Sequence, residues 1–361
     1  MKIIGLFPLT GNGGIASWTK KFVKTFPDEE HLFSFVDVAP TKPRSGGYEP
    51  MLYRITSGIS TLLRVRKEIK ALLKAEHYDI LHTTTSGNIG SFRDLVVAKL
   101  CHRYGTKTIM HCRYGCITED IHSSGMIGGM LRKSMREFDQ IWVLDSRSFN
   151  TLKNIKYLSD KVFLTPNSTD VTEPIDTAPK NYVSVAFCGN LIPSKGLYEL
   201  TEAARKSHVT LHVIGPGMPD VNERVKEIAG DELGKTIFLH GRMPNPEAVK
   251  FLKSVDMVAL PTYYQSEAFP ISIIEAMSLS KMVISCPRAA VQDMLTDLDG
   301  NPCGLLVPPK SVDAIVEAIR WCQTHKEEAD KMCRKAYEKV KACYDKEVVY
   351  NIYRYNYKKL I

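Results

Sequence analysis

The chain has 361 residues, of which 44% are hydrophobic and 24% charged, a composition typical of a soluble globular protein with two domains. It begins directly with a strand-like run and contains no segment with the apolar length of a membrane span, so we expect a cytoplasmic protein. The net charge is +8, yet the basic residues are not interleaved with aromatic ones, and the nine cysteines lack metal-type spacing, which argues against nucleic-acid binding and against a structural metal.

Short apolar runs alternate with helical patterns along the whole chain, as expected of parallel sheets covered by helices on both faces. Because there are too many runs for one sheet, we predict an α/β fold with two sheets of about six strands. In the first half the runs are Ile3–Phe7, Leu32–Val36, Ile80–His82, Thr108–His111, Ile141–Leu144 and Val162–Thr165. In the second half they are Val183–Cys188, Leu211–Ile214, Ile237–Leu239, Met257–Leu260, Val283–Cys286 and Gly304–Val307.

The first candidate site is the glycine loop after the first strand. Gly13 and Gly14 precede a helical pattern over Ile15–Phe26. Glycine lets the backbone approach an anion, and the start of a helix favours negative charge; a plain tight turn is the alternative interpretation. The spacing is not the G-x-G-x-x-G of dinucleotide-binding enzymes, which disfavours a dehydrogenase.

The excess positive charge lies entirely in residues 1–170, and part of it follows one predicted helix, Ile59–Lys74. Ile59, Leu62, Leu63, Ile69, Leu72 and Leu73 recur there at helical spacing, and Arg64, Arg66, Lys67, Lys70 and Lys74 form a basic face. Two interpretations stay open: an ordinary solvated surface helix, or contact with anionic lipid or an acidic acceptor.

The middle and end of the chain supply the domain boundaries. Residues 166–181 are rich in Pro, Asn and Thr without apolar periodicity, as in a linker. We therefore predict a first domain over 1–170 and a second over 171–345, followed by a terminal helix over 346–361 that crosses back to the first. Asp297 and Asp299 have the spacing of a metal-binding D-x-D but lie in a turn-forming stretch, so we expect turn chemistry.

The strongest functional signal is a pair of carboxylates. Glu267 falls in the loop after the run Met257–Leu260, and Glu275 falls early in the next helical pattern. Both are expected at the carboxyl edge of a parallel sheet, where ligands bind, together with the first helical amides of Ile271 and Ser272. Carboxylates suit the vicinal hydroxyls of a sugar, and amides suit a phosphate. An isolated pair of this kind is more often a helix cap and a solvated residue.

Five segments, taken together and in order, resemble the family 4 glycosyltransferases, which are retaining enzymes of the GT-B fold. They are Gly11–Gly14, Ile109–His111, Thr165–Asp170, Gly189–Gly196 with Lys195, and the E-x7-E pair Glu267 and Glu275. The resemblance implies two Rossmann-like domains whose parallel sheets face each other across a cleft. It also implies that the nucleotide lies mainly on the second domain and the acceptor mainly on the first.

The same resemblance implies roles for individual residues. Glu267, Lys195 and His111 are expected to be catalytic, with Glu267 on the donor sugar, Lys195 on the diphosphate and His111 at a strand end beside the sugar. The donor-binding set is Gly13, Gly14, Gly189, Asn190, Lys195, Ala268, Phe269, Pro270, Ile271, Ser272 and Glu275. Asn190 departs from the arginine usual in the family, which removes one charge-assisted phosphate contact.

The function implied is transfer of a sugar from a nucleotide-sugar, a UDP- or GDP-sugar, to a saccharide or lipid-linked saccharide in surface polysaccharide assembly. The nucleotide-sugar is a substrate, and the resemblance implies no cofactor and no metal. An anionic membrane surface at the inner face of the cell membrane is a further expected partner. A sugar-nucleotide epimerase, a phosphorylase and a catalytically silent binding protein use the same fold and stay open as alternatives.

Overall fold

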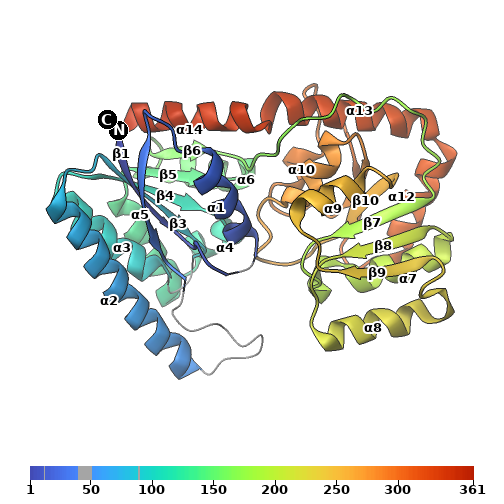
Figure 1. Ribbon diagram of the computed structural model, residues 1–361, viewed down its shortest axis with the longest axis horizontal. Coiled ribbons are helices and arrows are strands. Elements are labelled where there is room, and N and C mark those ends of the chain that lie inside the picture. Colours follow the sequence, from blue (N-terminus) through green and yellow to red (C-terminus); the bar gives the residue numbers. More distant parts are fainter. Residues whose placement is uncertain (12, 40–50, 88–89) are drawn as a thin grey trace. The chain divides into compact units, whose positions relative to one another are not determined.

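The computed structural model describes residues 1–361 except 12, 40–50 and 88–89, and for residues 51–55 it describes only the backbone. The chain forms two compact units (Figure 1). The first comprises residues 1–166 together with Tyr350–Ile361, and the second comprises residues 167–349. Among the described residues, no helix combines the length and apolarity needed to cross a membrane.

The first unit is built on a parallel sheet of six strands in the order β2-β1-β3-β4-β5-β6. The strands are β1 (Lys2–Phe7), β2 (Leu32–Asp37), β3 (Ile80–Thr85), β4 (Lys107–Cys112), β5 (Gln140–Val143) and β6 (Val162–Leu164). The helices that follow them are α1 (Gly14–Thr25), α2 (Met51–Ala75), α3 (Gly90–His102), α4 (Ile117–His122), α5 (Met126–Glu137) and α6 (Ser146–Lys153).

Two different cores cover the two faces of this sheet. On one face, aliphatic side chains of α2 and α3, among them Val65 and Val97, pack on Ile4 and Leu81 of the strands. The other face is aromatic: Phe22 of α1, Trp142 of β5, and Tyr353 and Tyr357 of the last helix, α14 (Lys346–Leu360), contact one another there. Residues 350–360 of α14 therefore complete the core of the first unit.

The second unit repeats the architecture, with six parallel strands in the order β12-β11-β10-β7-β8-β9. The strands are β7 (Ser184–Cys188), β8 (Thr210–Ile214), β9 (Ile237–Gly241), β10 (Met257–Leu260), β11 (Met282–Ser285) and β12 (Leu305–Leu306). Its helices are α7 (Leu197–Ser207), α8 (Pro219–Ala229), α9 (Asn245–Leu252), α10 (Ile271–Ser278), α11 (Val291–Met294), α12 (Val312–Thr324) and α13 (Lys326–Cys343), with single turns at Pro193–Lys195 and Gly230–Glu232. The prediction of two six-stranded parallel sheets is confirmed.

The predicted boundaries of several elements change in detail. The strand predicted over Ile80–His82 continues to Thr85, because Thr83, Thr84 and Thr85 are buried and pair with β4. Asp297 accepts hydrogen bonds from the amides of Asp299 (2.9 Å) and Asn301 (2.7 Å), which is the turn chemistry expected for this stretch.

In helix α2 the buried apolar stripe differs from the predicted one. Ile59 and Leu63, which the spacing assigns to that stripe, are exposed, and the buried apolar side chains are those of Val65, Ile69 and Leu73. Arg64 does not belong to the basic face, because its guanidinium donates to Glu68 of the next turn and to the carbonyl of Ala39.

Candidate functional site

The carboxyl edge of the second sheet brings the predicted catalytic pair together. Lys195 ends the single turn after β7, and Glu267 lies in the loop after β10, yet Lys195 Nζ and Glu267 Oε2 are 3.0 Å apart. The two side chains are only 15% and 12% exposed, so the ion pair is sheltered without being closed to a ligand. The Tyr263 amide, which donates to the Ser194 carbonyl over 2.9 Å, ties the two loops together.

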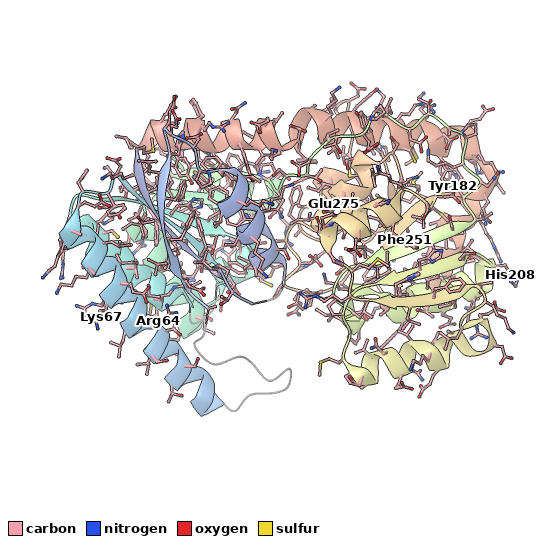
Figure 2. The ribbon with its side chains drawn as sticks, viewed as in Figure 1. Arg64, Lys67, Tyr182, His208, Phe251 and Glu275 are labelled. Carbon is pink, nitrogen blue, oxygen red and sulfur yellow. The ribbon has the colours of Figure 1, made fainter. Side chains whose placement is uncertain are left out.

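Glu275 reaches the same edge from α10 (Figure 2). It is buried, and its Oε1 accepts a hydrogen bond of 2.8 Å from Asn245 Nδ2 at the start of α9. The Cys188 thiol at the end of β7 interacts with both charges: burial and the Glu275 carboxylate together raise its pKa to about 12, against the lowering effect of Lys195. Lys195, Glu267 and Glu275 therefore surround the end of β7.

Two glycines permit the tight approach of the loops at this edge. A Cβ on Gly215 would lie 1.8 Å from the Gly189 carbonyl oxygen, and φ at Gly215 is +148°. A Cβ on Gly189 would lie 3.8 Å from Lys195 Nζ, so the Gly189 backbone is next to the ammonium group. Neither loop could close in this way with larger residues.

The other predicted donor-binding residues fall into two groups. Ile271 and Ser272 open the first turn of α10, where amide groups have no carbonyl partner within the helix and point at the same edge. The side chains of Ala268, Phe269 and Pro270 are buried instead, and Phe269 packs edge-on against Tyr344 at 5.2 Å between ring centroids. These three residues shape the loop through packing. Asn190 is half-exposed directly after Gly189.

A cavity of about 520 Å³ lies beside this cluster, a size that suits a small organic ligand. The loops after β7, β8 and β9 form it, and sequence reasoning missed it. The signal for it was the pair of glycines flanking Pro216. The lining residues are Leu191, Gly215, Pro216, Gly217, Pro219, Asn222, Glu223, Lys226, Leu239, Gly241 and Arg242.

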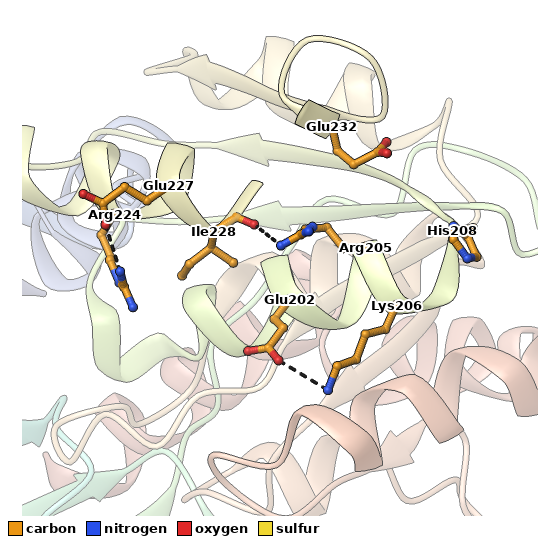
Figure 3. Close-up of a pocket in the computed structure, with 8 residues that line it drawn as sticks. All are labelled: Glu202, Arg205, Lys206, His208, Arg224, Glu227, Ile228 and Glu232. Atoms are coloured by element: carbon orange, nitrogen blue, oxygen red, sulfur yellow. Dashed lines mark hydrogen bonds and ion pairs between the residues drawn. The ribbon is translucent and has the colours of Figure 1, made fainter. Parts of the chain in front are cut away.

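A second hollow of about 540 Å³ lies between the carboxyl-terminal ends of α7 and α8, toward the amino edge of the strands (Figure 3). Its charges are already engaged: Arg224 pairs with Glu227, Lys206 pairs with Glu202, and Arg205 donates to the Ile228 carbonyl. Ligands of open parallel sheets bind at the opposite edge, so this hollow is not the candidate site.

In the first unit, the glycine loop has the predicted form. Gly13 has φ of +114° and caps α1, which begins at Gly14. A Cβ at either position would meet no atom within 4 Å, so the backbone here is open to a ligand. Asn12 of the same motif lies outside the described residues.

His111 lies at the carboxyl end of β4, as predicted, but its side chain is fully buried there. Its Nε2 lies 3.1 Å from Arg113 Nη1, and its Nδ1 lies 3.2 Å from His82 Nε2. A guanidinium only donates, so His111 Nε2 accepts, His111 Nδ1–H donates to His82, and His82 Nδ1–H donates to the Tyr357 hydroxyl at 2.5 Å. Both ring nitrogens of His111 are thus used inside the protein, and neither is left for a sugar.

Burial and the Arg113 charge set the electrostatics of this chain of residues. Both hold the pKa of His82 and of His111 well below the ordinary value, so the two rings are neutral at pH 7. Arg113, whose guanidinium stacks 3.9 Å from the centre of the Trp18 ring, stays protonated although burial lowers its pKa to about 10. The His82–His111–Arg113 network joins β3, β4 and α14 within the first unit.

Part of the chain matches a known protein family. Residues 170–339 match the family described as glycosyl transferases group 1, and this range contains Lys195, Glu267 and Glu275. The matched range lies within the second unit and spans most of it. No potential metal site, defined as three or more clustered His, Cys, Asp or Glu residues, occurs in this unit or in the rest of the described chain.

Individual relatives resemble parts of the chain. The D-rhamnosyltransferase WbpZ of Pseudomonas aeruginosa is 30% identical over 150 residues, which are 42% of this chain and 38% of the relative. The O-antigen chain mannosyltransferase C of Escherichia coli is 24% identical over 145 residues, 40% of this chain and 38% of the relative. The matched segments thus span about two fifths of these relatives.

A solved structure resembles the whole chain. HepE of Anabaena, determined in complex with UDP-glucose, superposes with a TM-score of 0.72 at 14% identity, covering 100% of both chains. At this identity the likeness shows the fold alone. The chain therefore has the GT-B fold of paired Rossmann-like units.

Proposed function

We propose that this chain is a retaining, metal-independent glycosyltransferase that moves a sugar from a UDP- or GDP-sugar to a saccharide or lipid-linked saccharide. The observation that carries the proposal is the sheltered Lys195–Glu267 ion pair beside Glu275, at the carboxyl edge of a group 1 glycosyl transferase domain. A cation and two carboxylates in one place match the diphosphate and the hydroxyl groups of a nucleotide-sugar.

The geometry suggests a division of roles. Glu275, oriented by Asn245, would accept hydrogen bonds from the ribose hydroxyls. Glu267 would bind the donor sugar, and Lys195 would lie between that sugar and the departing diphosphate. The cavity of about 520 Å³ next to Asn190 is the proposed space for the nucleoside.

The proposed mechanism is electrostatic. Negative charge grows on the diphosphate as the glycosidic bond breaks, and Lys195 with the first amides of α10 is already in place to stabilise it. The acceptor attacks from the face that the leaving group vacates, through an oxocarbenium-like state, so that the anomeric configuration is retained. No carboxylate of the site acts as a nucleophile in this scheme.

The first unit is the proposed acceptor domain, with the open glycine loop at Gly13 and Gly14 available to a phosphate group. Two relatives are named for D-rhamnosyl transfer and O-antigen chain mannosyl transfer, which supports a role in surface polysaccharide assembly. We place the enzyme at the inner face of the cell membrane, where lipid-linked saccharides are elongated.

Donor binding and turnover test this proposal separately. Thermal shift against UDP-, GDP-, ADP-, CMP- and dTDP-sugars should reveal stabilisation by one nucleotide series, which Glu275→Ala loses. Glu202→Ala and Lys206→Ala break an exposed ion pair at the opposite edge of the same unit and serve as matched controls. Conversion of the donor without acceptor would indicate an epimerase, a requirement for inorganic phosphate would indicate a phosphorylase, and binding without turnover in the presence of an acceptor panel would refute catalysis.

A further inference from the structure

Three neighbouring helices of the first unit expose large apolar side chains. Met126 of α5 is 85% exposed, Leu63 of α2 is 60% exposed and Phe92 of α3 is 46% exposed. Ile59 of α2 and Ile127 of α5 are exposed as well. These five residues are called the apolar tip below. Such side chains are usually scattered singly over a surface, so a group on three packed helices needs an explanation.

The members of the apolar tip lie at the same level along their helices. In the first unit α2, α3 and α5 pack side by side on one face of the sheet, α3 against both others (Figure 1). Leu63, Phe92 and Met126 each precede the last residue of their helix by 10 to 12 residues, which is about three turns. Each helix runs away from the carboxyl edge of the sheet, so the apolar tip lies at that edge, on the same side as Gly13 and Gly14.

The exposed face of α2 continues from the apolar tip into positive charge. With about 100° per residue, Ile59, Leu63, Arg66, Lys67, Lys70 and Lys74 fall within an arc of about 100°. All six are exposed, whereas Val65, Ile69 and Leu73 are buried against the sheet. Lys67 points away from the unit into solvent (Figure 2). We call Arg66, Lys67, Lys70 and Lys74 the basic row.

We propose that the apolar tip and the basic row together dock this chain on an anionic lipid bilayer. The inference rests on the proposed function and adds to it the surface by which the enzyme reaches a lipid-linked acceptor. The basic row begins about 5 Å and ends about 16 Å from Leu63 along the helix and shares its exposed arc, so with this face of α2 lying on the bilayer the apolar tip inserts while the charged groups stay among the headgroups. Lysine stems extend far enough to adapt to this depth.

Charge selects the lipid surface over another protein copy. A second copy of the same face would bring one basic row against another, and like charges at close range oppose that contact. Anionic lipid attracts every member of the row at once, and this attraction is strongly weakened by salt. Docking would hold the carboxyl edge of the first unit, with its glycine loop, close to the headgroups.

Vesicle co-sedimentation tests the docking. The parent should bind vesicles of phosphatidylcholine with about one third phosphatidylglycerol at least tenfold better than phosphatidylcholine alone, and the preference should fall with added salt. Leu63→Asp and the pair K67Q/K70Q should each lower binding at least fivefold. The matched controls are Leu298→Asp, another exposed leucine, and K326Q/K331Q, two exposed lysines of α13; both should bind like the parent.

Insertion is measured independently with Leu63→Trp, whose emission should shift to the blue with anionic vesicles and be quenched by brominated acyl chains. Equal recovery with neutral and anionic vesicles, or full binding by K67Q/K70Q, overturns the proposal. A concentration-dependent dimer that Leu63→Asp disperses, without vesicle binding by the parent, would show that the partner is a second copy.

The same proteins separate this inference from the proposed function. Thermal shift by the nucleotide-sugar and transfer to a water-soluble acceptor should be unchanged in Leu63→Asp and K67Q/K70Q. If Lys195→Ala keeps its vesicle binding while the parent never transfers sugar, the docking surface stands and the proposed function fails. If transfer to a soluble acceptor proceeds but no variant changes vesicle binding, the proposed function stands and the docking surface fails.

Discussion

The ends of β7 in the second unit and of β4 in the first carry charged and titratable groups in contrasting environments. At the carboxyl edge of the second sheet, Lys195 and Glu267 keep 15% and 12% of their side-chain surface exposed, and Glu275 accepts a hydrogen bond from the Asn245 amide of another helix. At β4, His82 and His111 are fully buried and connected to Arg113 and Tyr357. The groups that remain partly accessible to solvent are suited to binding a ligand, whereas the buried network holds β3, β4 and α14 in position.

The contrast is tested most strongly at Lys195. Lys195→Ala should lower the rate of sugar transfer by about 100-fold or more, since removing one preorganised charge at a developing anion typically has this effect. The folded state should survive, because the residue is a partly exposed loop lysine. Steady-state kinetics with circular dichroism of the variant measure both. A variant with parental kcat/KM would contradict the role of the ion pair.

The enclosed network should instead respond in stability to pH. His82 and His111 have pKa values depressed in the folded state but near 6.5 when unfolded, so only the unfolded chain gains these protons as the pH falls. Each histidine's stabilising contribution is present above pH 6.5 and is lost below it, about 1.4 kcal/mol per histidine between pH 7.5 and 5.5.

Urea unfolding at these pH values, followed by the fluorescence of Trp18 and Trp142, checks this expectation. His82→Leu should remove about half of the pH dependence that the two histidines give to the free energy of unfolding. It should also lower that free energy by about 1 to 3 kcal/mol at pH 7.5, because the Tyr357 hydroxyl and a His111 nitrogen lose their partners. His77→Ala, which removes an exposed histidine, is the control. An unchanged pH dependence in His82→Leu would show that the network titrates in the folded state.

A smaller effect is expected at Asn245, which touches the donor site only through Glu275. Asn245→Ala should raise the KM for the nucleotide-sugar by about tenfold, corresponding to about 1.4 kcal/mol for one lost hydrogen bond to a charged group, with little change in kcat. Initial rates over a range of donor concentrations separate the two constants. Loss of kcat at constant KM would place Asn245 in the transition state rather than in donor binding.

The smallest effect is expected at the ion pair Lys206–Glu202, where both side chains are about half exposed. Lys206→Ala should change the free energy of unfolding by less than about 1 kcal/mol and leave transfer intact, as is usual for surface pairs. Chemical denaturation and the transfer assay measure this. A large loss of activity would give the hollow between α7 and α8 a functional role.

The sequence predicted the alternation of strands and helices and the meeting of Lys195, Glu267 and Glu275, because parallel strands place their following loops at one edge. It could not separate His111 from the surface, since burial there comes from Trp142, Tyr353 and Tyr357, which are distant along the chain. The exposure of Ile59 and Leu63 was equally hidden, because spacing gives the angle between side chains but not which arc faces the sheet. The extension of β3 over Thr83 to Thr85 was also missed, because these residues are buried although their side chains are polar.

The position of Tyr353 and Tyr357 in the chain has a consequence for synthesis. Domains generally fold in order as they leave the ribosome, at about 5 to 20 residues per second. The aromatic face of the first sheet is complete only when residues 350–361 arrive, after the 183 residues of the second unit. Synthesis of the second unit takes about 10 to 40 s at this rate. During that time Phe22 and Trp142 lack their tyrosine partners, and the second unit can fold first.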